Sequence, residues 1–437
     1  MDKKILLTTT YRESRTKGYD YGATYMRRGL RFSGVRICSY GLRFIKQNIP
    51  GVEVLEYPTW EEYANTIKEG WDILGFSFYI NEIPEILRMV GHARKAGVRE
   101  IWGGNYGAMT EGMEKYFDRI FIGYAEGELA AALGEQVDRI RHPPLIKWVG
   151  LPKIKFFTQG MLFTTRGCNL GCTFCQTPSF CSKPAKVPLE SIEEVLEYYA
   201  GLGITEIIIS DEYFGMFPSH SDKVVELLDK YGFYWRCMTR ANFLDRRLDE
   251  WSETGFAGAH IGIESFNQST LDAIGKRETT DVTIDVVKRL HEMRRAILGF
   301  YIIGFENETA ESIRADMKKL ADLKLDMTQI CILTPLPGSK LWGEIAEKYG
   351  IFERDWHKFD LHHLVWNHPK IRPDDAEKLL EQALREVHPT TGFFRTAKKL
   401  LTLYNMNGAF LGGYRYLAKS MIKANRFDYF PQKVRFL

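Results

Sequence analysis

Long apolar stretches are absent from this 437-residue sequence. No uninterrupted apolar run approaches the roughly 18 residues that a membrane-spanning helix needs, so we expect no such helix. The first residues contain only the short apolar run Ile5–Leu7, which predicts a strand and is too short for a signal peptide. Seven cysteines in a chain of this length, without a secretion signal, do not indicate a disulfide framework. We therefore expect a cytoplasmic protein whose thiols stay reduced.

Net charge is also small, because 59 Lys and Arg residues face 56 Asp and Glu residues. This balance gives no argument for a nucleic-acid partner. The excess is concentrated in a C-terminal tail, where nine Lys or Arg and one acid lie between Thr391 and Leu437. A basic amphipathic tail favours peripheral contact with anionic lipid or the covering of a substrate opening, but a packed helix with a solvated charged face fits equally well. The tail contains no recognised RNA-binding module, so nucleic acid is not expected.

Short apolar strands alternate with amphipathic helices in two parts of the chain. Roughly the first 135 residues predict a parallel, doubly wound sheet. A second series, starting at Met161, has six strand candidates separated by helices, which predicts an incomplete TIM-type (β/α)6 barrel. These strand candidates are Met161–Thr165, Glu206–Ser210, Phe233–Thr239, Gly258–Glu264, Leu298–Gly304 and Thr328–Thr334.

The fold class is therefore α/β, with four expected parts. Residues 1–135 form a Rossmann-like domain and residues 136–157, which contain three prolines and no clear period, form a linker. Residues 158–345 form the partial barrel. Residues 346–437 form a mainly helical region that ends in the basic tail.

Three cysteines within eight residues follow the first barrel strand: Cys168, Cys172 and Cys175. Thiolates are the ligands that iron–sulfur clusters require, and three of them leave one iron of a 4Fe–4S cluster open for chemistry. Structural zinc usually takes four ligands from paired motifs, and a second pair is missing unless Cys181 and a distant histidine supply it. Cys181 itself is expected to be a loop thiol. A purely structural cysteine cluster is the remaining alternative.

The spacing Cys-x3-Cys-x2-Cys after a strand resembles the radical S-adenosylmethionine (SAM) superfamily. The resemblance implies that the open iron chelates SAM and that one electron, passed through the cluster, cleaves SAM to a 5′-deoxyadenosyl radical. It also implies an external electron donor such as flavodoxin or ferredoxin. Phe174 occupies the place where the family has an aromatic residue beside the adenine.

Polar residues at three later strand ends agree with this resemblance. Ser210, Asp211 and Glu212 follow the second strand, where a carboxylate can accept hydrogen bonds from the SAM ammonium, although a solvated helix cap is the alternative. Arg240 follows the third strand, and Glu264 and Ser265 end the fourth. These correspond to family positions that hold the SAM carboxylate and ribose. Lys276 fits a ligand contact and a surface charge equally well.

The first domain is similar to the cobalamin-binding module that precedes the barrel in one radical SAM subfamily. Candidate contacts are Ser77, Gly103 and Gly104, since small residues at strand ends let a flat ligand approach the backbone. The Asp-x-His-x-x-Gly loop that supplies a cobalt ligand is absent, and no histidine precedes His92. Two alternatives stay open: cobalamin bound without a histidine, or a domain kept as a scaffold.

We therefore expect a radical SAM enzyme acting on an unactivated carbon of a small molecule or lipid. With cobalamin bound, the resemblance implies C-methylation. Without it, the same architecture implies C–C bond formation, cyclisation or transfer of another SAM fragment. A carrier that binds iron–sulfur and cobalamin is the alternative of a different class.

Overall fold

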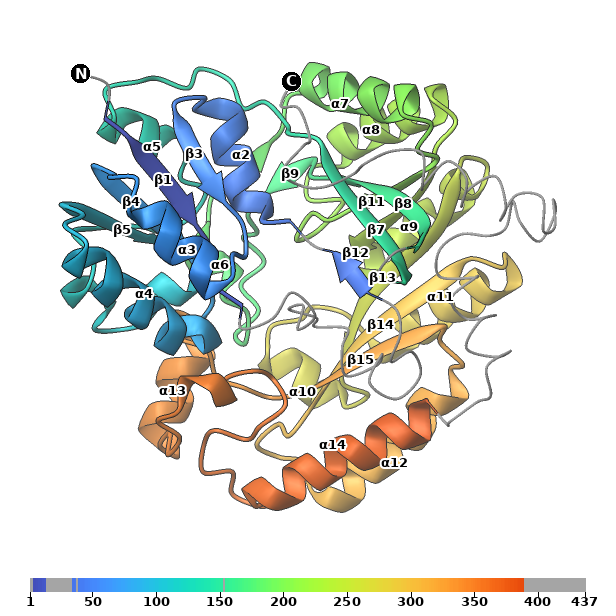
Figure 1. The fold of residues 1–437 in the computed structure, drawn as a ribbon. Coiled ribbons are helices and arrows are strands. Elements are labelled where there is room, and N and C mark those ends of the chain that lie inside the picture. Colours follow the sequence, from blue (N-terminus) through green and yellow to red (C-terminus); the bar gives the residue numbers. More distant parts are fainter. Residues whose placement is uncertain (1–2, 13–33, 37, 152–153, 389–437) are drawn as a thin grey trace.

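The computed structural model describes residues 3–12, 34–36, 38–151 and 154–388, which form two large sheets with helices packed on both, and one small two-stranded sheet (Figure 1). Among these residues no helix is long and apolar enough to cross a membrane. The C-terminal tail from Thr391 to Leu437 lies outside the described residues, so its predicted roles stay predictions.

The N-terminal sheet has five parallel strands in the order β3-β1-β4-β5-β6. Its strands are β1 (Ile5–Thr8), β3 (Val52–Leu55), β4 (Ile73–Ser77), β5 (Glu100–Gly104) and β6 (Arg119–Phe121). The connecting helices are α2 (Tyr40–Asn48), α3 (Trp60–Ile67), α4 (Ile83–Lys95) and α5 (Glu126–Ala132). Numbered within this domain, the strand order is 2-1-3-4-5, the flavodoxin-like arrangement, which confirms the predicted doubly wound sheet. The strand order reverses between β1 and β4, while the strands stay parallel, and such a switch point is where ligands bind in these folds.

The second sheet contains the six parallel strands of the predicted partial barrel, in the order β15-β14-β13-β12-β11-β8. These strands are β8 (Ile154–Leu162), β11 (Glu206–Ile209), β12 (Tyr234–Thr239), β13 (Phe256–Glu264), β14 (Ala296–Ile303) and β15 (Met327–Ile332). The helices between them are α7 (Leu189–Gly201), α8 (Pro218–Lys230), α9 (Ala241–Ser252), α10 (Gln268–Ala273), α11 (Thr280–Glu292) and α12 (Ala310–Asp322). The predicted fold class is confirmed.

Alternation along the barrel strands separates a helix-covered face from an inner face. On β11, Ile207 and Ile209 belong to the main core with residues of α7 and α8, such as Val195 and Leu228. Ile208, between them, belongs to a separate small cluster with Met161. Apolar contacts between the strands and the outer helices therefore stabilise the barrel. Polar side chains can then lie on the inner face and at the strand ends.

The segment 136–157, predicted to be a linker without regular structure, contains a strand and the start of another. β7 (Leu145–Leu151) pairs antiparallel with β8, and β2 (Gly34–Arg36), which the sequence did not reveal, pairs antiparallel with β7. The first half of β8 pairs only with β7, because β11 reaches β8 at Gly160–Leu162 alone. Strands of this kind form because they pair with the edge of a neighbouring strand, and they show no apolar periodicity of their own. The sequence pattern therefore did not predict them.

The first barrel strand was predicted to run unbroken over Met161–Thr165, and it is interrupted. β8 ends at Leu162, and a separate two-residue strand, β9 (Thr165–Arg166), pairs with β10 (Ala185–Lys186). The backbone N–H of Thr164 donates to the Asp211 carboxylate at 2.6 Å and not to a neighbouring strand. This side-chain contact accounts for the interruption.

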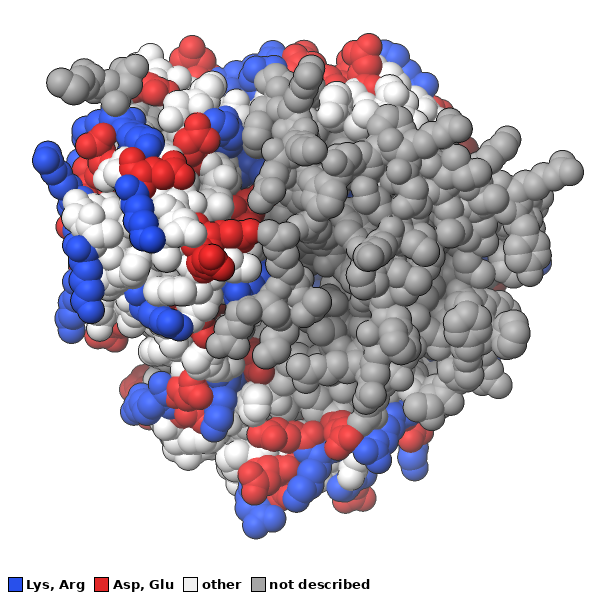
Figure 2. Space-filling view, viewed as in Figure 1, with Lys and Arg blue, Asp and Glu red and all other residues white. Residues whose placement is uncertain are grey.

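After the barrel, the helices α13 (Lys340–Lys348) and α14 (Pro373–Val387) extend the fold, and α14 lies beside α12 (Figure 1). The exposed face of α14 carries charges of both signs, including the i,i+4 pair Arg385–Glu381. Figure 2 shows Lys, Arg, Asp and Glu side chains intermixed over the described part of the face in view. That part of the face offers no extended surface of one charge.

Gly255 tests how closely the barrel strands pack. A Cβ at this residue would lie 1.9 Å from the backbone oxygen of Phe233, whereas a Cβ at Gly201 in α7 would meet no atom within 4 Å. We expect Gly255→Ala to cost about 1–3 kcal/mol and to lower the thermal unfolding temperature. Gly201→Ala should leave that temperature unchanged or raise it, since Ala favours a helix. Equal unfolding temperatures of the two variants in calorimetry would contradict the strand packing.

Candidate functional site

The three predicted cluster ligands lie in one loop that follows β9, at the carboxyl end of the barrel strands. Cys168 is buried, and Cys172 and Cys175 are partly exposed. Gly167 and Gly171 adopt positive φ angles of 84° and 77°, which turn the backbone around this loop. The Cys168 N–H donates to the Cys181 carbonyl at 3.2 Å, and the Thr173 N–H donates to the Ile274 carbonyl at 3.0 Å. Phe174 is half-buried against the main core.

Among the described residues, no three His, Cys, Asp or Glu side chains are grouped as ligands of a single metal ion would be. A 4Fe–4S cluster needs no such convergence, because its thiolates bind different iron atoms. Burial raises the pKa of Cys168 to about 11 and also raises the pKa of Cys175, so a metal must displace their protons.

Asp211, predicted to contact the SAM ammonium, forms its hydrogen bonds with other residues of the protein. Its carboxylate is fully buried and accepts hydrogen bonds from the Thr164 N–H at 2.6 Å, the Thr164 hydroxyl at 2.5 Å and the Thr165 hydroxyl at 2.8 Å. Asp211 therefore fixes the chain immediately before the cluster loop. Its neighbour Ser210 is half-buried, and its N–H donates to the Leu162 carbonyl at 2.8 Å.

Glu212 also holds the loop. One of its carboxylate oxygens accepts a short hydrogen bond from the Tyr124 hydroxyl, and the other accepts from the Gly167 N–H at 3.2 Å. Burial raises the pKa of Glu212, and these hydrogen bonds act in the opposite direction. Tyr124 follows the N-terminal sheet, so Glu212 joins that domain to the loop.

Four buried charges meet at the ends of β12 and β13. The Lys276 ammonium lies 3.0 Å from Glu264 and 3.6 Å from Glu278, and the Arg240 guanidinium lies 3.6 Å from Glu278. The predicted residues Arg240 and Glu264 are thus brought together, and Lys276 is buried and not a surface charge. Glu278 was missed, and its only signal is its place two residues after Lys276.

This charge group borders the cluster loop. The Cys172 thiol lies 4.0 Å from the Gly275 carbonyl, next to Lys276. Glu264 has a positive φ of 62°, which is strained for a residue with a side chain. Nη2 of Arg240 and Oε2 of Glu278 are buried without a hydrogen-bond partner. Ser265 is fully buried, and its hydroxyl accepts from the Asn267 N–H at 3.1 Å, so it shapes the turn.

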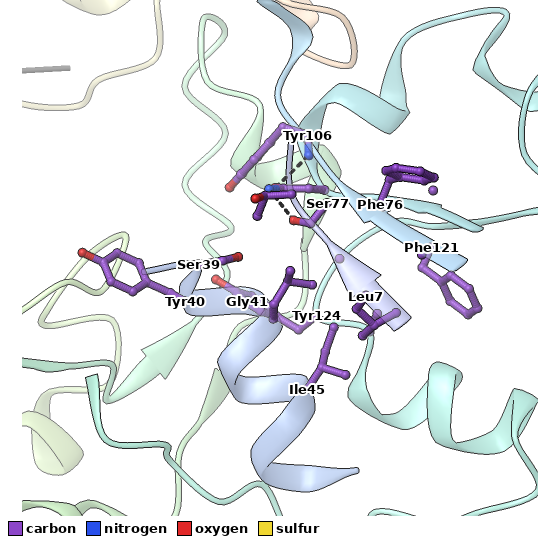
Figure 3. A pocket seen from close by; sticks show the side chains of 18 of the residues that line it. Leu7, Ser39, Tyr40, Gly41, Ile45, Phe76, Ser77, Tyr106, Phe121 and Tyr124 are labelled. Atoms are coloured by element: carbon purple, nitrogen blue, oxygen red, sulfur yellow. Dashed lines mark hydrogen bonds between the residues drawn. The ribbon is translucent and has the colours of Figure 1, made fainter. Parts of the chain in front are cut away.

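A large cavity lies at the point between β1 and β4 where the strand order reverses. Its volume is about 1250 Å³, including the part open to solvent. The predicted residues Ser77, Gly103 and Gly104 all line it, together with the start of α2. Phe163, Phe180 and Glu212 line it from the barrel side, so the cavity lies between the two domains. In Figure 3, Leu7, Ile45 and Phe121 lie toward one end and Ser77 and Tyr106 toward the other.

The glycines of this cavity also make room for other parts of the protein. A Cβ at Gly103 would lie 2.9 Å from the Phe117 ring, so this glycine makes room for a side chain of the protein. A Cβ at Gly104 would lie 3.3 Å from the backbone oxygen of Phe121. The polar end is ordered instead by Asn105, whose amide donates to the Ser77 hydroxyl at 3.2 Å and whose carbonyl accepts from the Tyr106 N–H at 2.8 Å.

Three carboxylates line the cavity: Glu82, Glu126 and Glu212. Glu126 is paired with Arg166, whereas Glu82 accepts the Tyr79 N–H at 2.7 Å, and burial raises the pKa of Glu82 to about 7. The described lining residues include no histidine. The cavity is thus rich in aromatic groups and hydrogen-bond acceptors.

Asp211 gives a pH-dependent prediction. Burial raises its pKa to about 7 from 3.8, so the folded chain binds this proton more tightly than the unfolded chain. Its stabilising contribution is therefore present below about pH 4 and is lost as the pH rises toward 7. The unfolding temperature of the wild type, relative to Asp211→Asn, should fall between about pH 5 and pH 7. The exposed substitution Asp229→Asn serves as control, and a pH-independent difference for Asp211→Asn would contradict the buried carboxylate.

Part of this chain is similar to proteins of a known family. Residues 162–320 match the family model of the radical SAM superfamily. An uncharacterised methyltransferase of Pyrococcus horikoshii is 29% identical over 60% of this chain and 58% of its own length. The bacteriochlorophyllide d C-12(1)-methyltransferase of Chlorobaculum tepidum is 26% identical over 64% of this chain and 62% of its own. The chain thus spans about three fifths of these curated relatives.

The fold has a solved counterpart over nearly its whole length. The radical SAM methyltransferase TsrM from Kitasatospora setae, solved with cobalamin and a [4Fe–4S] cluster, superimposes with a TM-score of 0.65 at 16% identity. The superposition covers 98% of this chain and 99% of that one. This likeness shows the shared fold, with both domains in the same order. The family-model match assigns residues 162–320 to the radical SAM superfamily.

Proposed function

We propose that this protein is a radical SAM methyltransferase that uses cobalamin and a 4Fe–4S cluster to methylate an unactivated carbon of a small molecule. One observation carries the proposal. The cavity between β1 and β4 is walled on one side by Phe180 and Glu212, which belong to or hold the cluster loop. Ligands bound in the cavity and at the loop would therefore be neighbours.

The charge group at the ends of β12 and β13 suits SAM. SAM carries a carboxylate and an ammonium on one end, and this group offers buried charges of both signs. Nη2 of Arg240 is ion-paired with Glu278 at 3.6 Å but makes no hydrogen bond, so it can donate to a carboxylate, and Glu264 can accept from an ammonium. Cys168, Cys172 and Cys175 would hold the cluster beside it. Asp211, with both oxygens engaged, would position the loop without touching SAM.

The cavity suits a corrinoid. Its apolar walls can cover the flat ring, and the acceptors Glu82 and Glu212, with the Ser77–Asn105 pair, can bind the amide groups on the ring edge. Because no described lining residue is a histidine and residues 1–91 contain none, cobalt would receive no histidine ligand from this domain's N-terminal part. When bound, the cluster supplies the electron that cleaves SAM, and cobalamin supplies the methyl group.

The chain's own residues would provide position and shielding. The buried pair Arg166–Glu126 and the Glu212 hydrogen bonds would hold the loop in place while charge changes on it. The aromatic side chains Phe163, Phe180 and Tyr124 would keep water from the space between the two ligands. An external one-electron donor such as flavodoxin or ferredoxin belongs to the proposal. Lipid contact through the C-terminal tail remains a prediction from sequence.

Two other functions differ from this one in what they need. Cobalamin-independent C–C bond formation or cyclisation needs the charge group and the cluster loop but has no use for a cavity of this size. A cobalamin or iron–sulfur carrier needs the cavity but has no use for the buried charges Arg240, Glu264 and Lys276. Methylation uses both sites.

The thiol ligands can be tested by SAM cleavage. After anaerobic reconstitution and reduction, the wild type should release 5′-deoxyadenosine from SAM, and Cys172→Ala should release less than about a hundredth as much. Cys181→Ala should keep the wild-type yield, because Cys181 contributes its backbone carbonyl to the loop. If SAM cleavage survived in Cys172→Ala, or disappeared in Cys181→Ala, the proposed set of cluster ligands would be wrong.

Cobalamin can be tested independently of activity. Hydroxocobalamin should stay with the desalted wild type, and its reduced Co(II) form should give an electron paramagnetic resonance spectrum without nitrogen splitting from histidine. Gly41 lines the cavity and Gly91, in α4, does not, and a Cβ at either meets no atom within 4 Å. Gly41→Phe should therefore abolish retention, and Gly91→Phe should not. Retention by Gly41→Phe would place cobalamin elsewhere.

A further inference from the structure

The cluster loop is fastened to the N-terminal domain by side chains that also line the cavity. These are Tyr106, Tyr124 and Glu126, which we call the clamp. All three follow strands of the N-terminal sheet: Tyr106 comes after β5, and Tyr124 and Glu126 come after β6. Each one contacts the loop, or a residue that holds it, through a separate interaction.

Glu126 makes the strongest of these contacts. Its two carboxylate oxygens accept from the Arg166 guanidinium at 2.9 and 2.8 Å, two residues before Cys168. Both side chains are at least 94% buried. The guanidinium also lies over the rings of Phe44, at 3.9 Å, and Tyr124, at 4.7 Å. A bidentate pair of this kind fixes the direction of Arg166 as well as its position.

Tyr124 acts through Glu212. Its hydroxyl donates to one oxygen of Glu212, whose other oxygen accepts the Gly167 N–H at 3.2 Å. The backbone at Gly123 also lies close to the backbone at Phe180, since a Cβ on Gly123 would lie 2.9 Å from the Phe180 carbonyl oxygen. The Tyr124 hydroxyl thus reaches the residue beside Cys168 through one carboxylate.

Tyr106 holds the far end of the loop. Its hydroxyl shares a hydrogen bond of 3.2 Å with Thr177, two residues after Cys175, and its ring stacks on Phe180 with centroids 4.3 Å apart. The two ends of the cysteine motif are therefore both fastened to walls of the cavity. A ligand that fills the cavity must touch or restrain the same side chains.

We propose that the clamp couples the two sites, so that a corrinoid in the cavity and a cluster in the loop each raise the affinity for the other. Tyr106, Tyr124 and Glu126 would act as positioning residues in this coupling. The inference rests on the proposed function and goes beyond it, because two neighbouring cofactors need not affect each other's binding. Ordering the shared side chains for one ligand lowers the cost of ordering them for the other. Linkage requires the factor to be the same in both directions.

The experiment measures the dissociation constant of hydroxocobalamin for the full-length chain, anaerobically, with the cluster reconstituted and without it. The wild type should bind at least about fivefold more tightly when the cluster is present. Bound hydroxocobalamin should likewise slow the release of iron to EDTA, measured by metal analysis of the desalted protein. This second reading does not require a folded cluster-free chain.

Tyr124→Phe and Tyr106→Phe each remove one hydroxyl of the clamp and keep the ring, and each should reduce the ratio of dissociation constants to below about twofold. Tyr57→Phe is the matched control, because Tyr57 lines the cavity from the β3 side, under the Arg12 guanidinium. It should leave the ratio unchanged even if it alters affinity itself. A ratio of one in the wild type, with cobalamin bound, would overturn the coupling and leave the proposed function standing. Absence of cobalamin binding would overturn both.

Discussion

The buried ion pair between Arg166 and Glu126 joins the N-terminal domain to the barrel domain beside the cysteine motif. Arg166 belongs to β9, next to the cysteine motif, and Glu126 begins α5 of the N-terminal domain. Neither charge has access to water, so removing one partner would leave the other uncompensated at a cost of about 3–5 kcal/mol. The pair adds little net stability compared with an apolar contact, but it permits only one relative position of its two partners. The position of the cluster loop against the cavity depends on this constraint.

Other carboxylates near the loop follow the same logic. Asp211 and Glu212 are adjacent in sequence, yet each is satisfied by donors from a different direction: Asp211 by Thr164 and Thr165, and Glu212 by Tyr124 and Gly167. Burial raises the pKa of both, which is the cost of removing carboxylates from water. The group of Arg240, Glu264, Lys276 and Glu278 contains a buried donor and a buried acceptor without a hydrogen bond, Nη2 of Arg240 and Oε2 of Glu278, which lie 3.6 Å apart as an ion pair. Physical chemistry therefore distinguishes carboxylates that hold the loop from charges available to a ligand.

Periodicity was enough to predict the parallel sheets, because an apolar strand between two amphipathic helices leaves few other arrangements. The cysteine motif is local, so its place after a strand could also be predicted. Asp211 and Glu212 were placed correctly at a strand end, but their partners come from 45 to 88 residues away and no local pattern names them. Gly103 lines the cavity and also makes room for the Phe117 ring, and a glycine in sequence does not tell which neighbour needs the space. β2 and β7 were missed for the same reason, since a strand defined by its edge partner has no signature of its own.

Parallel strands place their carboxyl ends on one edge, and two such edges face each other in this molecule. Leu7 and Ser77 reach the cavity from the N-terminal sheet, while Phe163 and Glu212 reach it from strand ends of the barrel. In a single α/β domain the carboxyl edge faces solvent or a loop cover, and a bound ligand meets only one sheet. When two such edges face each other, a ligand bound at one edge would lie next to a ligand bound at the other edge. The loops between the two edges would then line both binding sites. In the proposed function, a group transferred between the two ligands would then need no movement of either domain, so the fixed Arg166–Glu126 contact would favour that transfer rather than restrict it.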